Sequence, residues 1–180
     1  MSEDKKVLLE VQKVKKEFVT SKSLTGKPLK IVHAVDSVDL TIYEGETIGV
    51  VGESGCGKST LGRCILQLIR PTAGNVLYRG EDITKLNKEQ MRQMRRKMQL
   101  IFQDPYASLD PRMTIGEIIA EPLNIQKRYK TQEETRAQVL KVMEVVGLNT
   151  KYYNRYPHEF SGGQRQRIGI ARAIVLNPSL

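Results

Sequence analysis

The sequence predicts an α/β fold, in which an antiparallel β region precedes an α/β core that carries an α-helical insertion. Residues 7–19 and 31–43 are rich in Val and Ile and alternate polar with apolar side chains, as paired strands do. Strand and helix patterns then alternate through residues 47–102. Helical patterns dominate residues 114–176, so the helical insertion is expected to follow the core.

Length and composition fit one domain with an ordinary packed core. The chain has 180 residues, of which 39% are hydrophobic. The longest nearly uninterrupted apolar run, residues 168–176, contains Arg172 and is far too short to cross a bilayer. No apolar stretch near the N-terminus is long enough for a signal peptide. We therefore expect a soluble chain that stays in the cytoplasm.

The chain is basic, with a formal net charge of +9. Such a charge suits nucleic acid, an anionic membrane surface or a polyanionic small ligand. The densest cluster, residues 92–97, fits a solvated helix face, and no RNA-binding aromatic motif or zinc-finger spacing accompanies it. Charge alone therefore does not predict a nucleic-acid partner. Neither of the two cysteines, Cys56 and Cys64, has a nearby Cys or His at the spacing of a metal site. We expect Cys56 to be a small filler in a loop and Cys64 to be a core residue of a helix.

Turn-forming residues separate the elements of the first half. Residues 20–30 contain Gly and Pro and are expected to form a loop. Residues 47–51 form a short apolar run, which predicts a strand of the buried kind. A helix is expected over residues 60–69, ended by Pro71, and a further strand over residues 74–78.

Helix starts in the second half carry reciprocal caps, which satisfy two otherwise free backbone N–H groups. Each pairs a cap residue with a Gln or Glu three positions later: Asn87 with Gln90, Thr114 with Glu117, and Thr131 with Glu134. Residues 98–102 predict a buried strand. The helix that begins at Gln132 ends at Gly147. Its expected core face consists of Ala137, Leu140, Met143 and Val146.

Residues 52–59 fit the phosphate-binding P-loop pattern at every required position. Glycines let successive backbone N–H groups point into one hollow, and the helix start behind them adds partial positive charge. Lys58 is placed to reach the outer phosphates, and the Ser59 hydroxyl is placed to ligate Mg²⁺. A plain tight turn would not explain a lysine followed by two hydroxyl residues. The predicted nucleotide-binding residues of the loop are Gly52, Glu53, Ser54, Gly55, Cys56, Gly57, Lys58, Ser59 and Thr60.

A second glycine motif lies downstream, and it consists of Ser161, Gly162, Gly163 and Gln164. Ser161 is able to cap a helix, and the two glycines permit close backbone approach to its N-terminus. The motif therefore predicts a second anion site. Taken alone, the same residues also fit a plain capped helix in which Ser161 pairs with Gln164.

Together with the P-loop, residues 161–164 resemble the signature sequence of ABC ATPases, and residues 167–173 continue that pattern. Residues 102–112 and 156–160 are similar to the oligopeptide and dipeptide importer branch, which also includes nickel importers. The long loop at residues 20–30 fits the same branch.

The resemblance implies ATP and Mg²⁺ as cofactors and adds two site residues. Gln103 stands where ABC ATPases place a glutamine that contacts Mg²⁺ and the attacking water, so Lys58 and Gln103 are the expected catalytic residues. Ser59 and Gln103 are the expected metal ligands. Phe18 stands where this branch has an aromatic that stacks on adenine, although Phe18 fits a core position equally well.

The resemblance covers about residues 7–180 and implies a P-loop NTPase domain of the ABC type, incomplete at its C-terminus. Its expected parts are an antiparallel β region (7–46), a P-loop core (47–103), a helical insertion (104–160) and a signature helix (161–176).

One part of the family pattern is missing. In this family the Walker B strand follows the signature helix and supplies an Asp for Mg²⁺ and a Glu as general base; a switch histidine comes later. Here no Asp or Glu follows Glu159, and His33 and His158 both precede the signature. We therefore expect this chain alone to bind ATP and to hydrolyse it slowly or not at all. Since the missing strand would lie in the same sheet as residues 47–51, we also expect marginal stability, self-association or dependence on a partner.

The resemblance further implies a subunit that couples ATP binding and hydrolysis to peptide import. Two such domains would sandwich MgATP, each P-loop facing the signature motif of the other in trans. The expected partners are a second ATPase subunit, usually a different chain, the membrane-spanning permease subunits and, indirectly, a solute-binding protein. We expect no nucleic-acid partner and a peripheral location at the cytoplasmic face of the membrane.

Three other functions remain open at this point. The ABC-type ATPases of DNA repair or chromosome maintenance share the signature and suit the basic charge, but they usually place a long insertion between the motifs. P-loop metabolite kinases do not require the signature at residues 161–164. A degenerate, regulatory nucleotide-binding subunit is the third alternative.

Overall fold

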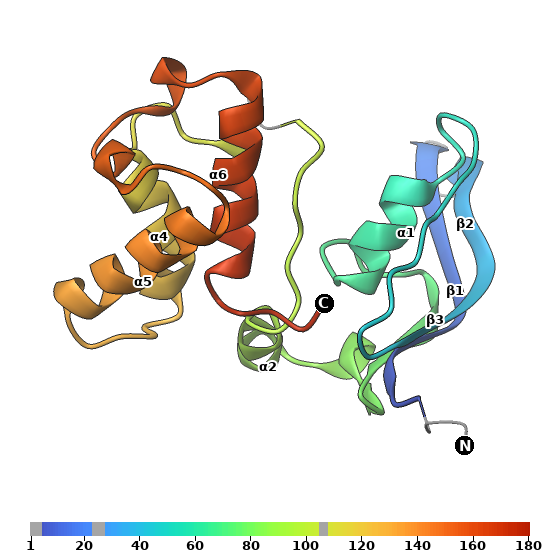
Figure 1. The fold of residues 1–180 in the computed structure, drawn as a ribbon. Coiled ribbons are helices and arrows are strands. Elements are labelled where there is room, and N and C mark those ends of the chain that lie inside the picture. The colour runs from blue at the N-terminus through green and yellow to red at the C-terminus, as the bar shows by residue number, and fades with distance from the viewer. Residues whose placement is uncertain (1–4, 23–27, 105–107) are drawn as a thin grey trace. The chain divides into compact units, whose positions relative to one another are not determined.

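The computed structural model describes residues 5–22, 28–104 and 108–180. The chain divides into two compact units, Met1–Met91 and Arg92–Leu180, and each is described by itself (Figure 1). The first unit holds the strands and the P-loop, and the second holds most of the helices and the signature motif.

The first unit is built on a four-stranded antiparallel sheet of order β2-β1-β3-β4. Its strands are β1 (Val7–Lys22), β2 (Pro28–Tyr43), β3 (Ala73–Tyr78) and β4 (Glu81–Asp82). The strands predicted over residues 7–19, 31–43 and 74–78 are thereby confirmed. β1 and β2 extend into the predicted loop at residues 20–30, and residues 23–27 lie outside the described part of the chain.

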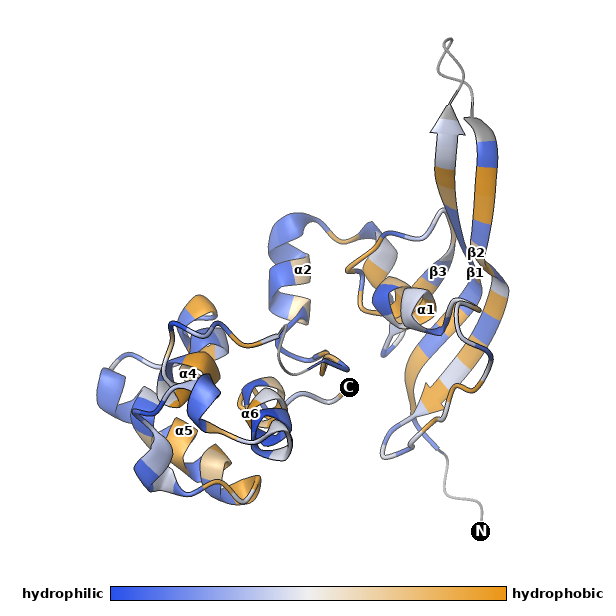
Figure 2. Ribbon diagram, turned by 90° about the horizontal axis from the view of Figure 1, so that it is seen from above, coloured by the Kyte–Doolittle hydropathy of each residue, from blue (hydrophilic) through white to orange (hydrophobic). Residues whose placement is uncertain are grey.

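Apolar side chains alternate with polar ones along the strands, and the buried apolar side chains form the core of this unit. Leu9, Val11 and Val14 of β1 are buried, and Leu9 pairs with Tyr78 of β3, which is also buried. Figure 2 shows the apolar residues as bands that alternate with polar ones along β1 and β2. Helix α1 (Lys58–Ile65) packs against both strands and buries Leu61 and Cys64. The prediction of Cys64 as a core residue is confirmed, and burial raises the pKa of its thiol.

Two predicted strands are wrong. Residues 47–51 and 98–102 contain no strand, and the side chains of Val51 and Phe102 are 96% and 47% exposed. A buried strand requires a neighbour that pairs with its backbone N–H and C=O groups along its length. Neither segment belongs to the sheet of the described residues, and in residues 98–102 the Gln99 N–H donates to the carbonyl oxygen of Leu180 at 2.9 Å without forming a strand ladder. The predicted helix over residues 60–69 also ends early, at Ile65.

The second unit contains four helices in its described part: α2 (Lys88–Met94, which begins in the first unit), α4 (Ile115–Ile125), α5 (Gln132–Val145) and α6 (Gly162–Ile174). Short 3₁₀ turns connect them: η2 (Thr150–Tyr152) and η3 (Pro157–Glu159), while η1 (Ile83–Lys85) belongs to the first unit. Helix α4 packs against both α5 and α6 (Figure 1). The core of this unit includes Ile115, Ile118 and Ile119 of α4, Met143 of α5 and Ile168 of α6.

The predicted caps are confirmed. Thr114 and Thr131 each form a reciprocal box with the Glu three positions later, and Asn87 and Gln90 exchange the same two hydrogen bonds. Gly147 follows α5 in the left-handed conformation, as expected.

The predicted core face of α5 is partly wrong. Met143 is buried as predicted, but Ala137 is exposed and Leu140 and Val146 are half-buried. The buried set is Val139, Val142 and Met143. These residues are spaced three and four apart, so they form a stripe displaced by one position from the expected face.

No helix in the described ranges has the length and apolar character that a bilayer span requires.

Candidate functional site

The P-loop ends at the N-terminus of α1, which carries no side-chain cap. Gly57 is the N-cap residue with φ of 95°, and it forms no side-chain cap hydrogen bond. The first helical hydrogen bond runs from the Leu61 N–H to the Gly57 carbonyl oxygen, at 2.8 Å. The N–H groups of the first turn therefore have no acceptor within the helix and face the loop. By contrast, α4, α5 and α6 all begin with a reciprocal cap.

Two glycines of the loop need the left-handed region that side chains disfavour: Gly55 at φ 84° and Gly57 at φ 95°. A Cβ atom on Gly57 would collide with the carbonyl oxygen of Ala34 on β2. A Cβ atom on Gly52 would lie 2.7 Å from the Sγ atom of Cys56. Gly55 has open space at the same position. The loop is therefore pressed against the sheet at Gly57 and open at Gly55.

Lys58 folds back over the loop. Its Nζ atom donates to the carbonyl oxygens of Gly52, at 2.7 Å, and Glu53, at 2.6 Å. Its Nζ atom also lies 3.6 Å from the Sγ atom of Cys56. The ammonium group thus lies beside the loop with three donors, and exchange of these carbonyl acceptors would let it donate to a phosphate oxygen. The adjacent Ser59 is exposed, so its hydroxyl is accessible to a ligand.

A cavity of about 370 Å³ lies beside the loop within the first unit. Its walls come from β2, from residues 50–51 and from the P-loop, including His33, Val35, Asp36, Cys56 and Lys58.

Phe18 lies on the same hairpin, where it pairs with Val32 of β2. Val32 is two residues from Ala34, which touches the loop at Gly57. The Phe18 ring is 39% exposed, and the Nζ atom of Lys16 lies 5.1 Å from its centroid. Phe18 is therefore a surface aromatic with an ammonium group close to its ring.

The signature motif forms the start of α6. Ser161 caps the helix: its hydroxyl accepts from the Gln164 N–H at 3.4 Å, and its own N–H donates to the Gln164 side chain at 3.0 Å. The capped-helix interpretation is thus correct for Ser161 and Gln164. Gly162 and Gly163 are exposed and have open space where a Cβ atom would be. A partner could approach the backbone there without a steric barrier.

Three arginines of α6 reach carbonyl oxygens of other segments. Arg165 donates to the carbonyl oxygen of Pro157 at 2.8 Å, and Arg167 donates to that of Gly147 at 3.1 Å. Arg172 donates to the carbonyl oxygen of Ser108. Burial lowers the pKa of Arg172, and the nearby Glu121 opposes this shift. No local pattern in the sequence predicts the contact of Arg172, because Arg172 and Ser108 are 64 residues apart.

Gln103 is exposed and belongs to the second unit, whereas the P-loop belongs to the first. Asp104 follows Gln103, and residues 105–107 after it lie outside the described part of the chain.

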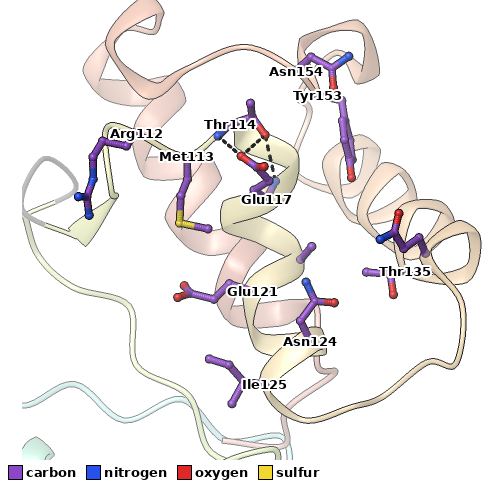
Figure 3. Close-up of a pocket in the computed structure, with 12 residues that line it drawn as sticks. Arg112, Met113, Thr114, Glu117, Glu121, Asn124, Ile125, Thr135, Tyr153 and Asn154 are labelled. Carbon is purple, nitrogen blue, oxygen red and sulfur yellow. Dashed lines mark hydrogen bonds between the residues drawn. The ribbon is translucent and has the colours of Figure 1, made fainter.

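A second hollow, of about 760 Å³, lies in the second unit between α4, α5 and the turns beside them. Figure 3 shows Glu121, Asn124 and Ile125 along α4 and Thr135 on α5 across the hollow. Hydrogen bonds from the backbone and hydroxyl of Thr114 lower the pKa of Glu117 at one end. Arg112 lies at the rim, and its hydrogen bonds lower the pKa of Asp110 to about 2. The sequence predicted the cap at Thr114 but not the hollow.

No group of three or more His, Cys, Asp or Glu side chains that could hold a metal ion occurs among the residues that the structure describes. Mg²⁺ beside a nucleotide takes oxygen ligands mainly from phosphates and water. The protein need supply only one or two oxygens, and the exposed hydroxyl of Ser59 at the start of α1 fits that role.

Known proteins resemble this chain in sequence and in fold. A profile of the ABC transporter family matches residues 35–180. The oligopeptide transport ATP-binding protein OppF of Bacillus subtilis (strain 168) is 54% identical over 172 residues, which are 95% of this chain and 54% of that protein. OppF of Escherichia coli (strain K12) is 52% identical over an alignment of 182 positions, which covers 100% of this chain and 54% of that protein.

Among solved structures, the dimeric post-hydrolysis state of the ATP-binding cassette MJ0796, bound to ADP and Pi, aligns with a TM-score of 0.83 and 32% identity. The alignment covers 95% of this chain and 71% of that one. The α/β fold of the ABC type that the sequence predicts is thereby confirmed. The chain spans about half the length of the curated relatives it matches.

Proposed function

This chain belongs to the ABC transporter family, and on that premise we propose that it is the ATP-binding subunit of an importer for oligopeptides. The observation that carries the proposal is the uncapped start of α1 beneath the P-loop, with Lys58 beside it. The oligopeptide-transport relatives support the solute class.

In this proposal the P-loop binds the phosphates. The N–H groups of the first turn of α1 donate to phosphate oxygens, and Lys58 exchanges its carbonyl acceptors for the outer phosphates. Ser59 and Gln103 hold Mg²⁺, and the exposed ring of Phe18 stacks on adenine. Bound MgATP supplies the phosphoryl group whose transfer to water releases the free energy for transport.

The signature motif completes the site of a second subunit. The exposed backbone at Gly162 and Gly163 approaches the nucleotide on the partner P-loop, and Ser161 orients that helix start through its cap. The three arginine contacts hold α6 in place within its own unit. The partner is a homologous ATPase subunit, most often a different chain, so we propose a heterodimer.

The helical insertion faces the transporter's membrane-spanning permease subunits in this proposal, and the hollow beside α4 offers them a recess. The subunit then lies at the cytoplasmic face of the membrane, and a solute-binding protein delivers the peptide from the other side. The 180 residues by themselves supply binding and positioning groups but no carboxylate after Glu159. We expect them to hydrolyse ATP slowly or not at all when they are assayed alone.

Nucleotide binding is the first test. Titration of the purified protein with a fluorescent ATP analogue should show saturable binding that Lys58→Ala abolishes, because the charge that neutralises the outer phosphates is lost. Lys141→Ala, which removes an exposed lysine from α5, should bind like the parent. Equal binding by the parent and Lys58→Ala would contradict the proposed site.

Uptake tests the solute class. Cells that carry Lys58→Ala should fail to import labelled oligopeptides and should still import solutes of other transporters. If cells with Lys58→Ala still imported peptides but no longer imported a different solute, the chain would still be an ATP-binding subunit. The proposed peptide substrate would then be refuted.

A further inference from the structure

A cluster of cations occupies the surface where the end of α2 meets the end of α4. We call it the basic patch, and it consists of Arg95, Arg96, Lys97, Lys127, Arg128 and Lys130. Five of these six side chains are exposed, and Arg96 is half-buried. All six belong to the second unit.

The two segments of the patch are joined by hydrogen bonds. The Nε atom of Arg96 donates to the side-chain oxygen of Gln126 at 2.7 Å, and its Nη2 atom donates to the Gln126 carbonyl oxygen at 3.0 Å. The Gln126 amide in turn donates to the carbonyl oxygen of Arg92 at 3.1 Å. Gln126 is buried, so these bonds hold residues 95–97 beside residues 127–130.

Local sequence explains why the cations face outward. Met91, Met94 and Met98 are buried, whereas Arg95 and Lys97, in the turn that follows α2, are exposed. At the end of α4, Lys127 adopts the left-handed conformation with φ of 48°, and the Arg128 N–H donates to the Leu123 carbonyl oxygen at 3.0 Å. This turn ends the helix and directs Lys127 and Arg128 away from it.

Stability of α4 does not account for the whole patch. One or two cations at a helix C-terminus interact favourably with its dipole, and Arg96 and Arg128 fill that role. None of the ion pairs between described residues involves Arg95, Lys127 or Arg128. The nearest acidic residues along the chain are Glu133 and Glu134. Glu134 accepts from the backbone N–H groups of Lys130 and Thr131. The patch therefore keeps a strong positive potential at the surface.

An apolar side chain lies beside the cations. Ile125, the last residue of α4, is 58% exposed and directly precedes Gln126 and Lys127. Figure 3 shows Ile125 at the end of α4. A surface that combines lysines and arginines with an exposed aliphatic group is typical of proteins that lie on anionic membranes. Binding of single-stranded nucleic acid would instead call for exposed aromatic rings, and the only aromatic residue within 125–130, Tyr129, is half-buried.

We propose that the basic patch binds the headgroups of anionic phospholipids, with Ile125 inserted between them, and so fixes the helical insertion against the membrane surface. The proposal rests on the proposed function for the presence of a membrane beside the subunit. It adds a lipid contact to the contacts with the permease subunits. Since each Lys or Arg near an anionic surface contributes about a fivefold gain in binding, equivalent to ~1 kcal/mol, six cations suffice for reversible adsorption.

Co-sedimentation with vesicles tests the proposal. The purified protein should sediment with vesicles of phosphatidylcholine and phosphatidylglycerol, but not with vesicles of phosphatidylcholine alone. Binding should weaken as salt is added, because salt screens the charges. Binding equal on both vesicle types, or on neither, would overturn the proposal.

Two sets of variants locate the contact. The triple variant Arg95→Gln, Lys127→Gln, Arg128→Gln should bind anionic vesicles roughly a hundredfold more weakly, at about fivefold for each charge. The matched control Lys30→Gln, Lys141→Gln, Lys151→Gln removes three exposed lysines outside the patch and should lose much less. Thermal unfolding of both triple variants establishes that they are folded. An equal loss in the two variants would show that only net charge matters and would refute a lipid site at the patch.

Further measurements separate this proposal from its alternatives. Ile125→Ser should weaken vesicle binding at high salt as well as at low salt, because the inserted aliphatic group is not screened. Tighter binding to duplex DNA than to anionic vesicles would overturn the proposal in favour of a nucleic-acid surface. Lys58→Ala should leave vesicle binding unchanged, so failure of the ATP site and failure of the lipid contact are distinguishable.

Discussion

Gly57 and Gly55 have the same backbone requirement and different surroundings. Both adopt a left-handed conformation, but only Gly57 lies against another backbone, that of Ala34. No atom lies within 4 Å of the position that a Cβ atom on Gly55 would take. One glycine therefore seats the loop on the sheet, and the other leaves room for the ligand.

Alanine at these two positions should separate stability from binding. Gly57→Ala should lower the free energy of unfolding by about 1–2 kcal/mol for the left-handed residue, and by about 1–3 kcal/mol more for the collision with Ala34. Gly55→Ala should cost only the first amount and should weaken ATP binding, because its methyl group occupies the open space. Denaturant unfolding and ATP titration measure the two effects. A stability loss as large for Gly55→Ala as for Gly57→Ala would contradict this account.

Individual contacts differ in how far the sequence reveals them. The P-loop and signature positions were evident because each motif is contiguous, and the roles of their residues in ATP binding stay predictions. The contact between Arg172 and Ser108 had no local signal, because it depends on how α6 packs. The hollow beside α4 was missed for the same reason, since its walls come from several segments.

Among the elements, helices with a local start signal were predicted correctly. Thr114, Thr131 and Ser161 each form the cap that their sequence spacing indicates, since both partners of a capping box lie within one turn. Residues 47–51 and 98–102 were predicted wrongly as strands, because an apolar run becomes a strand only when another segment pairs with it. That partner is not encoded in the run itself.

The caps of α5 and α6 provide a matched comparison. Thr131→Ala and Ser161→Ala should each lower the free energy of unfolding by ~1 kcal/mol, because each removes the side chain that accepts from the helix start. Only Ser161→Ala should also weaken ATP-dependent association with the second ATPase subunit, if the signature acts in trans. Unfolding curves and sedimentation velocity provide the two readouts. An equal loss of association in both variants would show that general stability, not the signature, controls the dimer.

In the whole molecule, apolar residues lie exposed in the segments for which the described chain offers no pairing strand. Val50, Val51, Ile101 and Phe102 are all more than two-fifths exposed. Exposed apolar side chains of this kind, within each unit's own surface, promote association. We expect these 180 residues alone to self-associate or to depend on a partner. The surfaces expected to mediate this are residues 50–51 in the first unit and residues 101–102 in the second.

The substitutions Val51→Ser and Val76→Ser test whether exposed apolar side chains cause self-association. Val51 is 96% exposed and Val76 is 0% exposed. In the 180-residue chain, Val51→Ser should change the free energy of unfolding by less than about 0.5 kcal/mol and should reduce light scattering on concentration. Val76→Ser should cost about 1.5–3 kcal/mol of lost burial. A large stability loss in Val51→Ser would mean that Val51 is covered in solution.

The division into two units has a consequence for synthesis on the ribosome. Every strand pairing of the first unit lies within residues 7–82, so its sheet can close as soon as Asp82 has left the exit tunnel. The core cluster of the second unit begins only at Leu109 and needs Val175 for completion. The nascent chain therefore holds a finished hairpin and an accessible P-loop while the signature helix is still untranslated, and folding proceeds from the N-terminus in two steps.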